Sequence, residues 1–209
     1  MKETFLVITG DVVSSREISN RERLQKKLAS LCEEVNKKFK EFIVVKFSIT
    51  IGDEIQGLIR KNSPLLQITG YFEENLYPYK MRFGAGEGSI STNFYNTTSQ
   101  MDGECFFNSR QAIINAEKEK RSIKIILHNK TIESLLDIIL MWIEKTKEEW
   151  NEIHYKRYYL YKNLGSIEKV AKKEKVTKQS IWKSLKRAKY DLVLKSEEVI
   201  NKILSAEKG

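Results

Sequence analysis

Two aspartates in the N-terminal half stand where carboxylates could bind a metal ion. Asp11 follows a short apolar run, and Asp53 lies in a Gly-Asp dipeptide between two strand-like runs. If those strands are neighbours in a sheet, the two carboxylates converge at one edge, where hard oxygen ligands suit Mg²⁺ or Mn²⁺. Each residue alone has a simpler explanation, because Gly-Asp is a common turn and Asp11 could cap a helix. The pair therefore predicts the metal site.

The residues that follow Asp11 could hold a phosphate group. Ser14, Ser15 and Arg16 stand between a strand pattern and a helical pattern. Backbone N–H groups in such a loop can bind anions, and a guanidinium adds charge-assisted hydrogen bonds. Together with the aspartates, this loop predicts a site for a nucleotide bound with Mg²⁺ or Mn²⁺.

A second candidate site lies in a basic segment near the C-terminus. Residues 150 to 195 hold 13 Lys/Arg and 4 Asp/Glu, an excess of nine that equals the net charge of the whole chain. Within this segment Ser166 and Thr177 could each cap a short helix, with Val176 in the turn between them filling the core of the pair. Such a pattern is typical of a DNA-binding helix-turn-helix, and the alternative is a helical hairpin with a solvated basic face.

The second of these helices would bury Ile181, Leu185 and Ala188 and turn its polar side chains toward DNA. Gln can bind adenine through two hydrogen bonds, whereas Lys, Arg and Ser contact guanine or phosphate. The expected DNA-binding residues are Thr177, Lys178, Gln179, Ser180, Lys183, Ser184, Lys186 and Arg187.

Apolar periodicity predicts the elements that must position these groups. The order of elements is β, α, β, β, α, β, α, β, which predicts an α+β fold of ferredoxin-like type. We expect a mostly antiparallel sheet with helices on one face. Strand patterns occupy residues 4–9, 43–51, 55–59, 81–90 and 122–127. Helical patterns occupy residues 19–40 and 103–119, and a further helix starts at Ser63-Pro64.

From Thr131 onward the pattern is helical throughout. We therefore expect two domains, an α+β domain over residues 1–128 and an all-α domain over residues 129–209. The helix-turn-helix would lie at about residues 165–190 of the second domain.

The composition narrows the class of protein. No run of 18 apolar residues occurs, so no membrane span is expected, and the N-terminus has no signal-peptide pattern. Cys32 and Cys105 lack metal-type spacing, and two histidines are too few for a histidine-rich site. These features predict a cytoplasmic protein.

Four motifs together resemble the SatD family. They are GDVVSSR at residues 10–16, TIGDEIQG at 50–57, RFGAGEG at 82–88 and the stretch 102–110 with its DGE and final SR. The resemblance covers nearly the whole chain and implies a nucleotidyl cyclase-like palm domain joined to a helix-turn-helix. The stretch around Val170, Val176 and Ile181 also resembles region four of bacterial sigma factors, although those factors usually have an aliphatic residue in place of Ser184.

The N-terminal part is similar to class III nucleotidyl cyclases, and the likeness implies roles for individual residues. Asp11 and Asp53 match the two metal-binding aspartates, and with Arg110 they are the candidate catalytic residues. Cyclases place an asparagine four residues before that arginine, where this chain has Phe106, and Asn108 is out of register. The likeness therefore favours nucleotide binding over turnover, and it implies a homodimer.

These observations lead to two main hypotheses. The first is a DNA-binding transcriptional regulator whose cyclase-like domain binds a metal–nucleotide ligand and is not itself an enzyme. The alternative is a metal-dependent nucleotidyl cyclase or nucleotidyltransferase that carries a DNA-binding arm. A third reading is a structural interaction protein with an inactive palm domain.

Overall fold

The computed structural model describes residues 3–206 and divides the chain into two compact units. The first unit comprises the residues up to Asp137 together with those from Asn201, and the second is Ile138–Ile200. Mixed α+β structure with a five-stranded sheet makes up most of the first unit, and helices make up the second. Among the described residues, no helix is both long and apolar enough to cross a membrane.

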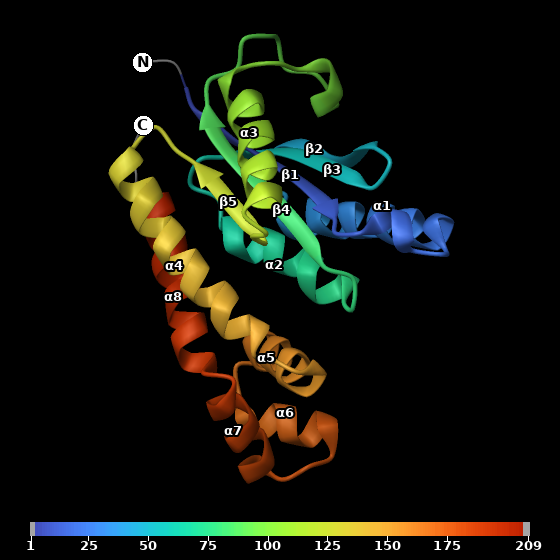
Figure 1. Ribbon diagram of the computed structural model, residues 1–209, viewed down its shortest axis with the longest axis vertical. Helices are drawn as coiled ribbons and strands as arrows, with labels where there is room; N and C mark the ends of the chain where they lie inside the picture. Colours follow the sequence, from blue (N-terminus) through green and yellow to red (C-terminus); the bar gives the residue numbers. More distant parts are fainter. Residues whose placement is uncertain (1–2, 207–209) are drawn as a thin grey trace. The chain divides into compact units, whose positions relative to one another are not determined.

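The sheet has the strand order β2-β3-β1-β4-β5 (Figure 1). Its central strand β1 pairs antiparallel with both β3 and β4, and β5 is parallel to β4. The order of the first four strands is that of a ferredoxin-like fold, as the sequence predicts. The strands are β1 (Phe5–Val12), β2 (Ile43–Ile51), β3 (Glu54–Arg60), β4 (Met81–Gly88) and β5 (Ile123–Ile126).

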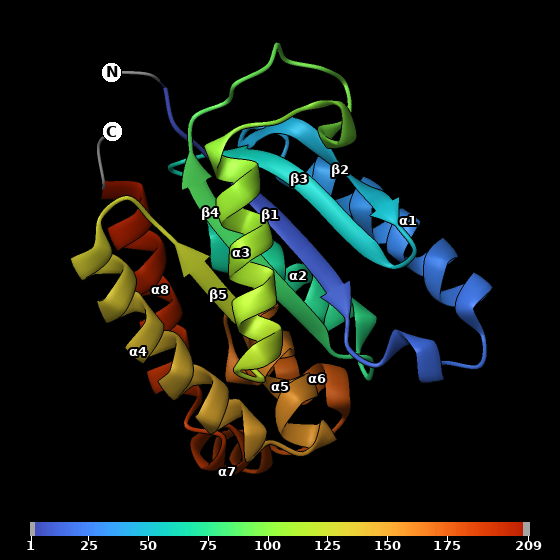
Figure 2. The ribbon, with the colours of Figure 1, turned by 45° about the horizontal axis from the view of Figure 1, so that its top comes forward.

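Helices cover both faces of this sheet, so the expectation of helices on one face is wrong (Figure 2). The Phe83 ring of β4 contacts Phe72 of α2 (Leu65–Leu76), with ring centroids 6.2 Å apart. The next residue, Gly84, points to the other face, where an added Cβ would lie 2.3 Å from the Ile113 nitrogen of α3 (Glu104–Lys118). Because Gly84, Gly86 and Gly88 alternate along β4, they leave one face bare and let α3 lie close against the backbone.

The first helix, α1 (Arg21–Lys38), buries one apolar face. Leu24, Leu28 and Val35 recur at helical spacing and are nearly inaccessible to solvent. The Asn20 side chain caps the helix by accepting a hydrogen bond of 2.9 Å from the Arg23 nitrogen. The helical pattern in the sequence starts at residue 19, so the helix begins slightly later than expected.

The second unit contains a small apolar core between short helices. Val170 and Ala171 of α6 pack with Ile181 and Leu185 of α7. The helices of this part of the chain are α4 (Lys130–Glu148), α5 (Glu152–Leu164), α6 (Ile167–Glu174), α7 (Lys178–Arg187) and α8 (Tyr190–Ala206), and the boundary between the units falls within α4 and α8.

Candidate metal and nucleic-acid sites

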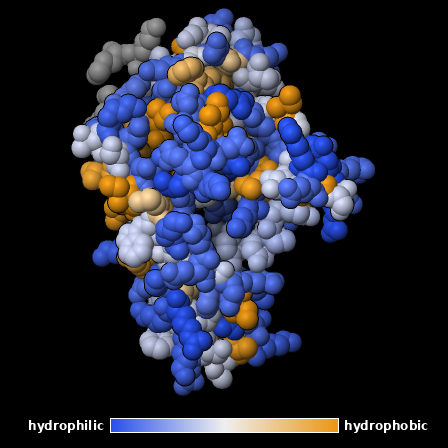
Figure 3. Space-filling model, viewed as in Figure 1, coloured by the Kyte–Doolittle hydropathy of each residue, from blue (hydrophilic) through white to orange (hydrophobic). Residues whose placement is uncertain are grey.

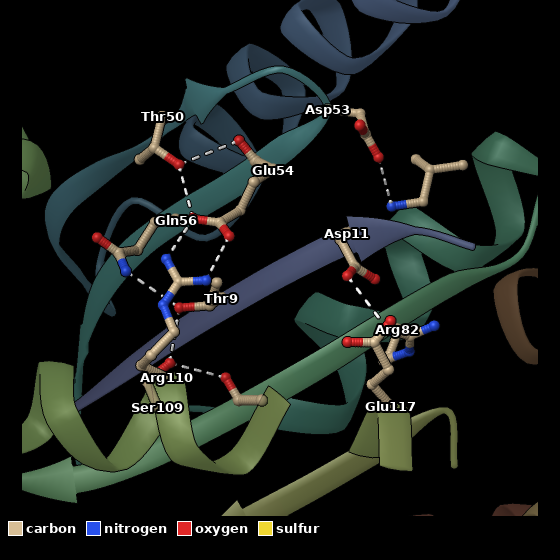
Figure 4. Close-up of polar contacts among 12 residues, drawn as sticks. Thr9, Asp11, Thr50, Asp53, Glu54, Gln56, Arg82, Ser109, Arg110 and Glu117 are labelled. Atoms are coloured by element: carbon tan, nitrogen blue, oxygen red, sulfur yellow. Dashed lines mark hydrogen bonds and ion pairs between the residues drawn. The ribbon is translucent and has the colours of Figure 1, made fainter. Parts of the chain in front are cut away.

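The structure brings Asp53 to the end of strand β1. Gly52, with φ of +61°, forms the tight turn that presents Asp53 at the tip of the β2–β3 hairpin. One carboxylate oxygen of Asp53 accepts a hydrogen bond of 3.1 Å from the Val12 nitrogen, and the other accepts one of 2.9 Å from the Ser15 hydroxyl. Asp53, the last residues of β1 and the following loop therefore form one connected group, and Figure 4 draws Asp53 beside the end of β1.

Asp11 carries a perturbed carboxyl group in the same place. Burial raises its pKa from 3.8 to about 6; the Arg82 charge opposes this shift, and Asp53, Glu117 and Glu54 add to it. Its Oδ2 lies 3.4 Å from Arg82, whereas its Oδ1 is buried without a hydrogen-bond partner among the described residues. A buried, unpartnered oxygen beside other carboxylates is a position where a cation would be stabilised.

The small number of protein ligands limits which metal ion this site can bind. Among residues 3–206, no group of three His, Cys, Asp or Glu side chains is placed to bind a metal ion. Mg²⁺ commonly binds through one or two carboxylates and takes its other ligands from water and phosphate. The pair Asp11 and Asp53 fits that kind of site, and it does not fit an all-protein metal cage.

Arg110 does not stand free beside the aspartates. Its guanidinium donates two hydrogen bonds, of 2.6 and 2.7 Å, to the carboxylate of Glu54, which also accepts one from Thr50 (Figure 4). Asn108 donates to the Glu87 carbonyl. The sequence reasoning did not single out Glu54 or Arg82, although Glu54 directly follows Asp53 and Arg82 opens the glycine-rich motif.

The loop after β1 begins with a left-handed turn. Ser14 adopts the left-handed conformation with φ of +55°, and Ser15–Glu17 forms a single 3-10 turn after it. A left-handed residue followed by a right-handed one turns successive N–H groups to the same side. The Ser15 hydroxyl donates its hydrogen bond to Asp53, whereas the side chains of Ser14 and Arg16 are both exposed at this turn.

The other candidate site is built on α6 and α7. The Thr177 hydroxyl caps α7 by accepting a hydrogen bond of 3.1 Å from the Ser180 nitrogen. Ser166 stands at the N-cap of α6 but makes no side-chain capping bond, and Lys175 ends α6 in the left-handed conformation. The result is two short helices joined by a three-residue turn, Lys175 to Thr177.

Most of the expected DNA-binding residues lie on the exposed side of α7, and two expectations in this region are wrong. Ser184 is only 8% exposed, because it lies within the arc that buries Ile181 and Leu185. Val176 is 39% exposed and does not fill the core. Ser180 is half-buried, and the expected residues that are exposed are Thr177, Lys178, Gln179, Lys183, Lys186 and Arg187.

Some of these cations already have local partners. Lys178 pairs with Glu168 at 2.8 Å, and Lys186 pairs with Asp191 at 2.5 Å. Among residues 3–206, Lys183 and Arg187 form no ion pair. Hydrophilic side chains cover much of the visible face of the part of the chain that contains α6 and α7 (Figure 3).

Fold and sites together define a mixed α+β protein with two aspartates at one end of the central strands and a basic pair of helices in a separate compact unit. The chain belongs to the SatD family, whose model matches residues 5–204. No curated protein sequence matches the chain significantly.

Several solved structures are similar to the chain. One is a bacterial light-regulated adenylyl cyclase, with 13% identity and a TM-score of 0.43 over 59% of this chain and 75% of that one. Another is the adenylyl cyclase CyaB from P. aeruginosa, with 14% identity and a TM-score of 0.43 over 61% and 78%. A regulator of polyketide synthase expression from Bifidobacterium adolescentis is matched over 97% of this chain and 86% of its own, with 13% identity and a TM-score of 0.29.

Proposed function

We propose that this chain is a DNA-binding regulator that enters the major groove with α7. The observation that carries the proposal is the composition of the two sides of that helix. One side buries Ile181 and Leu185 against α6, and the other presents Gln179 between exposed lysines. In a helix-turn-helix the exposed side near the start of the second helix faces the bases.

The local ion pairs of α7 do not oppose this function. Exposed pairs such as Lys178–Glu168 and Lys186–Asp191 are screened by solvent and contribute little, so the lysines can exchange carboxylates for phosphates at small cost. Lys183 and Arg187 need no such exchange. Each phosphate contact adds affinity by releasing a condensed counterion, which makes the binding salt-dependent.

Duplex binding by fluorescence anisotropy between 50 and 200 mM salt tests the proposal. Lys183→Ala should weaken binding to every duplex and reduce the salt slope by about one, whereas Gln179→Ala should weaken only the binding to a selected sequence. Lys37→Ala on α1 removes the same charge from the other unit and serves as the control. A wild-type protein that binds no duplex at 50 mM salt would refute the proposal.

A metal–nucleotide site at Asp11 and Asp53 is the second candidate function. The unpartnered Oδ1 of Asp11 supports it, because a divalent cation would supply the missing partner. Such a cation would neutralise phosphate charge when bound. The left-handed turn at Ser14 and Ser15 and the exposed Arg16 are proposed to hold the phosphates.

Binding rather than turnover is the better supported activity of this second site. The guanidinium of Arg110 is engaged by the Glu54 carboxylate through two hydrogen bonds. A nucleotidyl cyclase or nucleotidyltransferase that uses Asp11, Asp53 and Arg110 as catalytic residues would first have to break this pair. That enzyme remains the alternative function, and it requires product formation from a nucleoside triphosphate.

Calorimetry with ATP and GTP in the presence of Mn²⁺ tests the nucleotide site. We expect binding by the wild type, and its loss in Asp11→Asn and in Asp53→Asn. Glu198→Gln, an exposed change on α8, is the control. Nucleotide binding that persists in both aspartate variants, or no binding by the wild type, would refute the site.

A homodimer is also proposed, since a two-fold DNA-binding protein would read a palindromic site. Light scattering of the purified chain measures its mass directly. A mass of one chain both with and without duplex DNA would refute the dimer.

A further inference from the structure

One large aromatic side chain on α7 is left out of the packing of its own helix pair. Trp182 is 49% exposed, while Ile181 and Leu185 beside it are completely buried. Among the described residues it makes no hydrogen bond and no ring contact. By contrast, Trp150 packs on Tyr158 and donates its indole N–H to the Ala188 carbonyl. The core therefore does not explain a tryptophan at position 182.

The helical spacing places Trp182 at the side of the basic face. Gln179, Lys183 and Lys186 follow one another at steps of four and three residues and form one exposed column. Trp182 lies one turn after Gln179 and one turn before Lys186. Its indole is thus the apolar element of a surface whose other members are an amide and cations.

We propose that Gln179 and Trp182 read an A·T pair and its neighbour together, which makes Trp182 a specificity-determining residue; this rests on the DNA-binding function proposed above. The Gln179 amide pairs with N6 and N7 of adenine, and the indole covers the methyl group of an adjacent thymine. The ligand is duplex DNA whose half-site contains adjacent A·T pairs.

The chemistry of the bases selects this partner. Thymine is the one base that presents a methyl group in the major groove, and an apolar side chain recognises it by excluding water. Lys183 of the column and Arg187, which lies on the side of the column away from Trp182, can fix the register on phosphates. Duplex RNA lacks the methyl group and has a major groove too narrow for a helix, so it does not fit this surface.

The test begins with selection of bound sequences from a randomised duplex by the full chain. Thymines in the selected half-site are then replaced one at a time by deoxyuridine, which removes only the methyl group. Loss of a covered methyl should weaken wild-type binding about three- to fivefold at one position. Trp182→Leu and Trp182→Ala should lose affinity for the thymine site, and Trp182→Ala should no longer distinguish thymine from deoxyuridine.

Two comparisons keep the experiment decisive. Trp142→Ala removes a tryptophan of similar exposure, 54%, from α4 and should leave the deoxyuridine effect intact. Lys183→Ala should weaken thymine and deoxyuridine duplexes equally. Circular dichroism establishes that the variants are folded. If Trp182→Ala is not folded, Trp182→Leu replaces it in the comparison, because it retains an apolar side chain.

The outcomes separate this inference from the proposed function. Wild-type binding that is insensitive to every deoxyuridine replacement, or a selected site without A·T pairs, overturns the role of Trp182 while DNA binding stands. An equal deoxyuridine effect in wild type and Trp182→Ala overturns it as well, as does tighter binding to RNA or single strands than to duplex DNA. Failure to bind any duplex refutes the proposed function itself.

Discussion

Arg110 of α3 and Glu54 of β3 form a two-point ion pair across the face of the sheet, with distances of 2.6 and 2.7 Å (Figure 4). The Glu54 side chain is 14% exposed and that of Arg110 is 50% exposed. Both ends are therefore fixed to regular elements, but one of them still contacts water. The pair fastens α3 to the hairpin that carries Asp53.

A double-mutant cycle measures this pair. We expect Arg110→Ala to lower the free energy of unfolding by about 1 kcal/mol, because a half-exposed pair is screened by solvent. The double variant with Glu54→Gln should cost less than the sum of the two single changes. Urea denaturation gives each value, and strictly additive losses would mean that the pair contributes nothing to stability.

The raised pKa of Asp11 makes stability depend on pH in a definite direction. Folding raises the pKa of this carboxyl from 3.8 to about 6 through burial, so the folded protein holds the proton more tightly than the unfolded chain. Its contribution is therefore complete below pH 4 and is lost as pH rises through 6. Asp11→Asn should remove this loss and stabilise the protein at pH 7 by roughly 1–3 kcal/mol.

Thermal or urea unfolding from pH 4 to 8 checks this expectation, with Glu198→Gln as the control. Parallel curves for wild type and Asp11→Asn over that range would contradict it. Mn²⁺, if it binds Asp11, should abolish much of the difference at pH 7, because a bound cation favours the ionised carboxylate.

The close approach of α3 to β4 predicts an intolerance of side chains at Gly86. A Cβ there would lie 2.1 Å from the Ser109 nitrogen, a backbone atom that cannot move without the helix. Gly86→Ala should destabilise the protein by more than about 3 kcal/mol. Gly52→Ala is the matched control, since its φ is +61° but no atom lies within 4 Å, and it should cost about 1 kcal/mol. Similar melting temperatures of the two variants would contradict the packing.

The second unit contains a buried carboxylate whose ionised form is stabilised by two lysines. Glu197 is 5% exposed and accepts hydrogen bonds from Lys147 at 3.2 Å and Lys162 at 2.5 Å. Burial opposes ionisation, but the two lysine charges outweigh it and lower the pKa of Glu197 below 4.5. Its contribution to stability is therefore present above pH 4.5 and is lost as pH falls.

Removal of one lysine leaves the buried negative charge of Glu197 with a single cationic partner. Lys162→Met should destabilise the protein by about 2–3 kcal/mol at pH 7, less than when a buried charge loses every partner. Lys145→Ala, which breaks an exposed pair with Glu148, should change the free energy of unfolding by less than about 0.5 kcal/mol. Equal effects of the two changes in denaturant titrations would contradict the importance of the buried cluster.

Much of the sheet could be predicted from the sequence, because local patterns specify it. The alternation of Phe47, Ile49 and Ile51 with polar residues marks β2, and Gly52-Asp53 marks the turn. The mixed α+β fold agrees with this prediction. The faces of the sheet could not be assigned in the same way, since apolar periodicity does not specify which side a helix covers. The three alternating glycines of β4 are the sequence signal that a helix lies close against the backbone of this strand.

The errors around α7 have a similar origin. The sequence pattern places Ser184 with the polar residues of the outer side, although it lies three residues after Ile181 and four before Ala188, within the buried arc. Helical position outweighs the polarity of a small hydroxyl, which can be buried at moderate cost. Glu54 and Arg82 were missed for another reason, since partners that are far apart along the chain leave no local pattern.

The hydrogen bonds from Val12 and Ser15 to Asp53 also have a dynamic consequence. They close a loop of some forty residues that contains α1 and β2, and both bonds break when the hairpin tip and the segment after β1 separate. Exchange of the Val12 amide proton with solvent deuterium therefore reports on its hydrogen bond to the Asp53 carboxylate. The exchange rate measures how readily that end of the sheet opens.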